Sequence, residues 1–251
     1  MIDVGTFTSA TWVLVVLASV LLGFSKTAVG GIAMVSVAIF AAVLPARAST
    51  GLVLLLFLVG DVFALRAYTR FTEWAVLRRL APAVAVGIAV GALFLFVAAD
   101  LAVRRTIGVI LLVLVSVATV QKLRRRGEDD DPGPASSALM VSTGTISGFT
   151  SMVANAGGAI LSLYLLRLRL PVMVFLGTTA WFFFVVNVVK VPISLGLGLL
   201  DWSTVRATLV LSPAVVVGAL AGRAVARRMS LATFEWVILG VTFAAALNLV
   251  R

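Results

Sequence analysis

Cysteine and histidine are both absent from this chain of 251 residues. Without them the protein cannot form a disulfide, a thiolate nucleophile, a Cys/His zinc site or a Ser-His-Asp triad. Charged residues are also scarce, at 12% of the chain, whereas a soluble domain has about 25%. The sequence therefore argues against an enzyme that works through these groups, and we expect neither a metal nor a cofactor.

Hydrophobic residues make up 62% of the chain, and the mean hydropathy is +1.18. So few polar side chains cannot cover the surface of a water-soluble globule, so lipid must solvate much of this one. The formal net charge of +10 indicates basic cytoplasmic loops that face anionic lipid rather than a nucleic-acid partner. The sequence predicts an all-α, multi-pass membrane protein.

Apolar runs separated by short polar breaks predict about ten helical segments, and a full crossing needs about 20 residues. Two pairs of neighbouring runs are too short for a crossing: Thr11–Gly23 with Gly31–Leu44, and Leu139–Ile146 with Ala159–Leu166. Each pair is joined by a Gly/Ser/Thr-rich stretch. Irregular backbone at membrane depth is tolerated where it is buried in protein or lines a watery cavity. Each pair is therefore predicted to form a broken helical hairpin.

A charged run containing Pro132 and Pro134 divides the chain into an N-terminal repeat (1–121), a cytoplasmic linker (122–136) and a C-terminal repeat (137–251). Matching residues recur in both halves at corresponding positions. The matches are Gly23 with Gly148, Pro45 with Pro171, Phe57 with Phe183, Asp61 with Asn187, Gly87 with Gly218, and Gly91 with Gly222. So many ordered matches indicate a tandem duplication.

The relative orientation of the two halves follows from the charges of the loops. If each half has one hairpin and three full spans, the halves are inverted and most basic loop residues gather on one side of the membrane. If each short pair is one broken crossing, the halves are parallel and the basic residues divide almost evenly. Because basic residues concentrate on the cytoplasmic side, inverted repeats are predicted. Whether the hairpins are re-entrant or cross fully stays open.

Inverted repeats bring their broken segments together near the membrane midplane, where transporters bind substrate. Helices that begin at Gly31 and Gly158 would present free N–H groups and a positive dipole end. Lys26 adds a full charge, and neutral donors flank both breaks. Lys190 lies among apolar residues, where a charge costs about 2.5–3.5 kcal/mol, so it should face a cavity or a partner. Alternatively, the glycines only pack the hairpins and Lys26 reaches a surface.

The groups that favour a small anionic substrate form the predicted binding site. They are Ser25, Lys26, Thr27, Gly30, Gly31, Thr150, Ser151, Asn155, Gly157, Gly158, Thr178, Thr179, Trp181, Asn187 and Lys190. Trp181 could close a pocket over the substrate or belong to the core. Asp61, an acid deep within an apolar run, is the predicted coupling residue. It could form a fixed salt bridge with Lys26 or Lys190, or it could carry a proton through a transport cycle.

These motifs resemble those of the sulfite exporter TauE/SafE family of bacterial membrane transporters, from about Leu22 to about Gly222. They are Gly23–Thr27, Gly30-Gly31, Val59–Asp61, Gly148–Gly158, and Gly177-Thr-Thr-Ala-Trp-Phe-Phe with Asn187 and Lys190. The segment around Asn155 is the most specific part. The resemblance implies transport of a sulfur-containing anion, such as sulfite, a sulfonate or a related organosulfur acid, across the bacterial inner membrane. It also carries over Lys26, Asn155 and Lys190 as site residues.

The predicted function is secondary transport of a small sulfur-containing oxyanion by alternating access, coupled to the proton gradient. The chain has no Walker A motif, so an ATPase would be a separate chain. Two alternatives remain: a passive anion channel, which would not accumulate its ion against a gradient, and a membrane scaffold, which would tolerate Lys26→Ala and Asn155→Ala. An enzyme is not expected. The sequence leaves the substrate, the direction of transport and the oligomeric state open, a homo-oligomer included.

Overall fold

The computed structural model describes residues 2, 5, 7–27, 32–124, 136–225, 242–244 and 246–250. The helices bounded in these ranges are α1 (Ser9–Thr27), α2 (Ile32–Val43), α3 (Ala46–Tyr68), α4 (Trp74–Val97), α5 (Asp100–Arg124), α6 (Ser137–Ala154), α7 (Gly157–Arg167), α8 (Val172–Gly196) and α9 (Trp202–Val225). Residues 242–244 and 246–250 are also helical, and the described residues contain no strand. The predicted all-α class is confirmed.

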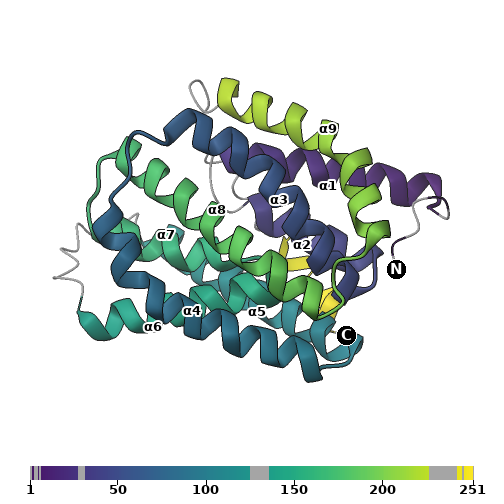
Figure 1. Cartoon of the computed structure of the whole chain (residues 1–251), viewed down its shortest axis with the longest axis horizontal. Helices are drawn as coiled ribbons and strands as arrows, with labels where there is room; N and C mark the ends of the chain where they lie inside the picture. The colour runs from purple at the N-terminus through teal and green to yellow at the C-terminus, as the bar shows by residue number, and fades with distance from the viewer. Residues whose placement is uncertain are drawn as a thin grey trace.

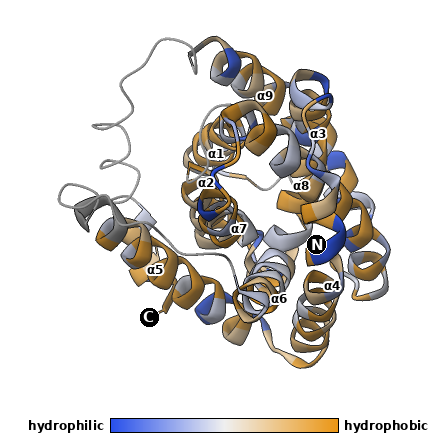
Figure 2. Ribbon diagram, turned by 90° about the vertical axis from the view of Figure 1, so that its left-hand side faces the viewer, coloured by the Kyte–Doolittle hydropathy of each residue, from blue (hydrophilic) through white to orange (hydrophobic). Residues whose placement is uncertain are grey.

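Six of the described helices are long and apolar enough to cross a membrane by length and composition, namely α1, α3, α4, α5, α8 and α9. The outward faces of α4 and α5 are largely apolar (Figure 2). On α4, for example, the side chain of Phe96 is 72% exposed. Lipid can solvate such faces, whereas a water-soluble monomer rarely exposes large contiguous apolar patches. The chain is therefore a multi-pass membrane protein.

The first predicted short run proves longer than the sequence suggested. We expected it to end at Gly23, but α1 has 19 residues and continues through Ser25, Lys26 and Thr27. The hydroxyl of Ser25 donates to the carbonyl oxygen of Leu22 at 2.7 Å. A serine that bonds back in this way can stay within a helix. Residues 28–31, which include the predicted Gly30-Gly31 pair, lie outside the described part of the chain.

The second predicted break is also narrower than expected. The helix α6 includes Thr150 and Ser151, and α7 starts at Gly157, so the non-helical backbone is confined to Asn155 and Ala156. The hydroxyl of Thr150 donates to the carbonyl oxygen of Ile146 at 2.8 Å, as Ser25 does in α1. Polar residues in these stretches were misleading because local side-chain bonds keep them helical. The predicted linker start at 122 likewise falls in the last turn of α5, and residues 125–135 are outside the description.

Two closely packed helix pairs frame the fold: α1 with α9, and α4 with α6 (Figure 1). A Cβ atom at Gly218 of α9 would overlap the carbonyl oxygen of Val20 in α1. In the other pair, a Cβ atom at Gly87 of α4 would overlap the carbonyl oxygen of Thr145 in α6. Glycine allows this close approach of two backbones. Each pair joins a helix of the first half to a helix of the second, and the predicted inverted duplication stays a prediction.

The helices α3 and α8 contact each other in the middle of the molecule (Figure 1). Proline precedes each of them, at Pro45 and Pro171, where its fixed φ and missing N–H are compatible with a helix start. The helix α3 also packs against α1 and α9, and α8 packs against α4 and α7. This central position places the polar residues of α3 and α8 between the two outer pairs.

The start of α9 is fixed by Asp201, which lies in the connection from α8. Its Oδ1 atom accepts hydrogen bonds from the Ser203 hydroxyl at 2.6 Å and from the Thr204 N–H and hydroxyl at 2.7 Å each. The hydrogen bond from the Ser203 hydroxyl is the main reason that the pKa of Asp201 falls from its ordinary 3.8 to about 2. Asp201 thus acts as an N-cap in its ionised form.

We expect Asp201→Ala to lower the free energy of unfolding by about 1 kcal/mol at pH 7, the usual value of an N-cap. Because the folded pKa is depressed, the stabilisation is complete above pH about 4 and is lost as the pH falls through about 2. Thermal unfolding of the wild type and the variant in detergent should show a difference in unfolding temperature at pH 7 that disappears near pH 2. An equal difference at both pH values would contradict the capping role.

Candidate functional site

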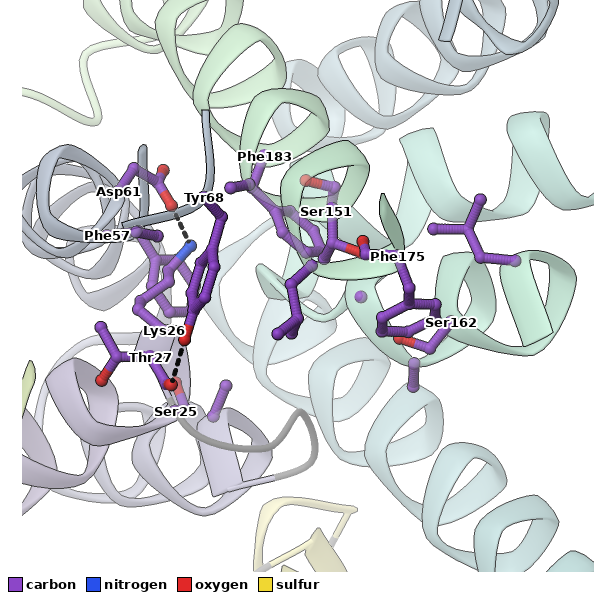
Figure 3. A pocket seen from close by; sticks show the side chains of 18 of the residues that line it. Ser25, Lys26, Thr27, Phe57, Asp61, Tyr68, Ser151, Ser162, Phe175 and Phe183 are labelled. Carbon is purple, nitrogen blue, oxygen red and sulfur yellow. Dashed lines mark hydrogen bonds and ion pairs between the residues drawn. The ribbon is translucent and has the colours of Figure 1, made fainter. Parts of the chain in front are cut away.

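A cavity of about 690 Å³ lies between the end of α1, the start of α2, the second half of α3, the α6–α7 break with α7, and α8 (Figure 3). Several of the predicted site residues line it. These are Ser25, Lys26, Thr27, Asp61, Ser151, Asn155, Gly158, Thr179 and Asn187. Residues from both predicted repeats therefore share one cavity.

A buried ion pair forms one wall of this cavity. Lys26 Nζ lies 2.6 Å from Asp61 Oδ1, and the two side chains are 9% and 1% exposed. The other carboxylate oxygen, Oδ2, accepts a hydrogen bond from Asn187 Nδ2 at 2.7 Å. A carboxylate with a donor on each oxygen is satisfied in its ionised form. Of the two partners that the sequence left open for Asp61, the structure selects Lys26.

Two aromatic rings enclose the Lys26 ammonium. Its Nζ atom is 4.0 Å from the centroid of the Phe57 ring and 4.8 Å from that of the Phe183 ring. Cation–π attraction to both rings offsets part of the cost of burying the charge. A Cβ atom at Gly158 would come within 2.8 Å of Phe183 Cζ, so this glycine leaves room for the ring. The rings, the carboxylate and the glycine together fix the ammonium at the cavity wall.

Lys190 is buried directly behind the α6–α7 break. Its Nζ atom donates to the Ser151 carbonyl oxygen and to Asn155 Oδ1, both at 2.6 Å, and the residue is 1% exposed. No carboxylate among the described residues lies within salt-bridge distance of it. Ser151 and Asn155 line the cavity and Lys190 does not. With Lys26 paired to Asp61, Lys190 is a second buried amine, and its partners are neutral oxygen acceptors of the α6–α7 break.

Asn155 holds the α6–α7 break in place. Its backbone is left-handed, with φ of 51°, and its N–H donates to the Ser151 carbonyl oxygen at 3.1 Å. Asparagine is one of the few residues that adopt this conformation readily. Its side-chain Nδ2 donates to the Thr50 carbonyl oxygen of α3 at 3.0 Å. One residue therefore ties the break to α3 and, through Lys190, to α8.

Some predicted residues serve other contacts. Thr150, Gly157, Thr178 and Trp181 are not part of the cavity lining. The Thr178 hydroxyl accepts a hydrogen bond from the Glu73 N–H at 2.9 Å, at the start of α4. Trp181 Nε1 donates to the Thr69 hydroxyl at 3.1 Å, and the Trp181 ring lies 5.0 Å from that of Trp74. Both residues thus contact the α3–α4 connection.

Part of the cavity wall was not predicted from the sequence. Additional lining residues are Met34, Phe57, Tyr68, Ser162, Arg169, Phe175 and Phe183. The sequence did contain a signal for Phe57 and Phe183, the two rings beside Lys26. Each ring lies four residues before a predicted polar residue, Asp61 or Asn187, and therefore shares a helix face with it. Nothing in the pattern distinguished Ser162 or Phe175 from ordinary helix residues.

Comparison with known protein families matches residues 15–249 to the family described as Sulfite exporter TauE/SafE. The chain belongs to this family. The match spans nearly the whole chain and so confirms the resemblance read from the motifs. Comparisons with curated proteins and with solved structures gave no match. Membership in the TauE/SafE family identifies the chain as a membrane transport protein of a family linked to sulfur-containing anions, and the described cavity lies within the matched residues.

Proposed function

We propose that this TauE/SafE protein is a secondary transporter that moves a small sulfur-containing oxyanion across the bacterial inner membrane by alternating access. The observation that carries the proposal is the Lys26 ammonium at the wall of a large cavity, with the Lys190 amine behind the α6–α7 break. An anion that leaves water needs compensating donors and positive charge. The Lys26 ammonium can supply both once Asp61 no longer neutralises it, which favours an anion over a cation or a neutral ligand.

We further propose that Asp61 couples transport to protons by competing with the substrate for Lys26. While Asp61 is ionised, it neutralises the ammonium at 2.6 Å. A protonated Asp61 can still accept from Asn187 through its carbonyl oxygen and releases Lys26 to pair with the incoming anion. Two other ionisable side chains lie nearby: Tyr68 of α3, whose hydroxyl donates to the Thr27 carbonyl oxygen at 3.3 Å, and Lys190 of α8, behind Asn155. Arg169 lines the outer part of the same cavity. Anion and proton then move in the same direction.

Uptake by proteoliposomes tests the transport function. The panel contains sulfite, thiosulfate, methanesulfonate and butanesulfonate, with acetate, butyrate and potassium as the comparison ions. We expect accumulation and counterflow of at least one sulfur-containing oxyanion and weaker transport of the carboxylates. Accumulation against a gradient separates a carrier from a passive channel. Transport of the carboxylates or potassium alone would overturn the proposal, as would no transport at all by folded protein.

Asp61→Asn provides the test of coupling. We expect an inward proton gradient to drive accumulation by the wild type at least tenfold above the level without a gradient. The variant should lose this response but keep exchange of internal for external substrate, because the amide can bind Asn187 but cannot carry the proton. Asp201→Asn, which changes an acid that is not part of the cavity lining, is the matched control and should respond as the wild type does. A gradient response retained by Asp61→Asn would contradict the role of Asp61.

A further inference from the structure

The cavity is much larger than an inorganic sulfur oxyanion. A water molecule occupies about 30 Å³ in the liquid, and sulfite has only four non-hydrogen atoms. A volume of about 690 Å³ would leave most of the space around sulfite to water. Sites of about 300–1,000 Å³ are typical for ligands of drug-like size. The volume therefore matches a ligand with a body beyond its charged group.

The two ends of the cavity differ in chemistry. Figure 3 shows Ser25, Lys26, Thr27 and Asp61 together on one side, Phe183 and Ser151 in the middle, and Phe175 on the far side. Most side chains at the far end, from α7 to the start of α8, are apolar, although Ser162, Arg169 and Thr179 also line it. Its lining includes Leu165, Leu166, Leu170, Val172, Phe175 and Leu176. A ligand that fits both ends has a charged head and an apolar body.

We propose that the substrate is an organosulfonate monoanion with an apolar body of several carbon atoms, an inference that rests on the transporter function proposed above. The sulfonate group takes the position beside Lys26, and the apolar body lies against Phe175 and Leu176. Burial of the body removes apolar surface of both ligand and wall from water, which favours binding in proportion to the area. Sulfite has no such body and gains nothing from this end of the cavity.

The anionic head belongs at the Lys26 end of the cavity. Lys26 is held by Asp61, and Lys190 has no carboxylate of the described residues within salt-bridge distance. Protonation of Asp61, as proposed above, frees the Lys26 ammonium to pair with the single negative charge of a sulfonate, while the rest of the cavity lining is mostly apolar. The exposed Arg169 lines the cavity from the α7–α8 connection and belongs to its outer part.

Uptake of a series of straight-chain sulfonates, from methanesulfonate to hexanesulfonate, tests the inference. Each compound is measured by mass spectrometry of washed wild-type proteoliposomes, with protein-free liposomes as the blank. We expect KM to fall two- to fourfold with each added methylene, fourfold being about the limit for complete burial of a CH₂ group. Carboxylates of the same lengths should show a higher KM throughout.

Phe175→Ala should weaken the dependence of KM on chain length. The KM for hexanesulfonate should rise at least fivefold, whereas the KM for methanesulfonate should change by less than twofold. Phe96→Ala, at an outward-facing phenylalanine of α4, is the matched control and should keep the wild-type slope. If Phe175→Ala does not fold, the wild-type series alone decides. A KM that is flat or rises with chain length, with sulfite still transported, would overturn this inference and leave the proposed function standing. Failure of sulfite, of thiosulfate and of every sulfonate would overturn both.

Discussion

Lys26→Met is expected to abolish anion transport, with at least a 100-fold loss in kcat/KM. Loss of one partner from a buried, hydrogen-bonded charge pair costs about 2–5 kcal/mol or more, and the substrate would lose the ammonium that faces the cavity. The substitution also leaves Asp61 buried without its cation, which destabilises the fold by about 3–5 kcal/mol. Initial uptake rates in proteoliposomes, normalised to folded protein, measure the effect.

The double variant Lys26→Met/Asp61→Asn separates the two consequences. It removes both charges, so the fold no longer contains an unpaired buried carboxylate and should recover most of the lost stability. Transport should stay absent because the cation is still missing. Arg206→Met, which removes an exposed cation of α9 near Trp202, should leave uptake unchanged. Wild-type uptake by the double variant would show that Lys26 serves only the fold.

Gly87→Ala is expected to have a large effect on stability outside the cavity. The new Cβ atom would overlap the Thr145 carbonyl oxygen, so α4 and α6 would have to move apart. Overpacking of this kind costs about 1–3 kcal/mol of stability. We expect a larger loss here because a backbone carbonyl, unlike a side chain, cannot rotate away from the new Cβ atom. Gly218→Ala should behave in the same way, since it meets the Val20 carbonyl oxygen of α1. Thermal unfolding in detergent measures both variants.

Gly196→Ala is the matched control for the two packing glycines. It lies at the end of α8 with open space around the position of a Cβ atom. Alanine is a better helix former than glycine by about 1 kcal/mol, so this variant should be as stable as the wild type or more so. If Gly87→Ala unfolded at the same temperature as Gly196→Ala, the close approach of α4 and α6 would be contradicted.

Much of the fold follows from composition and spacing. Long apolar runs predicted the spanning helices, and Pro45 and Pro171 marked the starts of α3 and α8 correctly. The errors fell where polar residues were taken as breaks, as at Ser25 and Thr150. Hydropathy does not reveal that a hydroxyl can bond to a carbonyl of the preceding turn and leave the helix intact.

The candidate site was less accessible to sequence reasoning. Burial costs predicted that Lys26, Asp61 and Lys190 need partners, but not which partner each would have. The choice depends on how α1, α3, α6 and α8 meet, and these helices are far apart in the chain. For the same reason, nothing in the sequence placed Lys190 behind Asn155, or turned Trp181 toward Thr69. The apolar end of the cavity could not be predicted either, because its residues have the same composition as any membrane-spanning helix.

Protection of one introduced thiol tests the position of the substrate most directly. The chain has no cysteine, so Ser162→Cys places a single thiol at the cavity wall, and Ser137→Cys places one at the exposed start of α6. The rate of modification by N-ethylmaleimide is measured with and without saturating butanesulfonate. If butanesulfonate occupies the cavity, we expect at least fivefold slower modification of Ser162→Cys and an unchanged rate for Ser137→Cys. Equal rates at Ser162→Cys with and without butanesulfonate, in protein that transports it, would contradict the account.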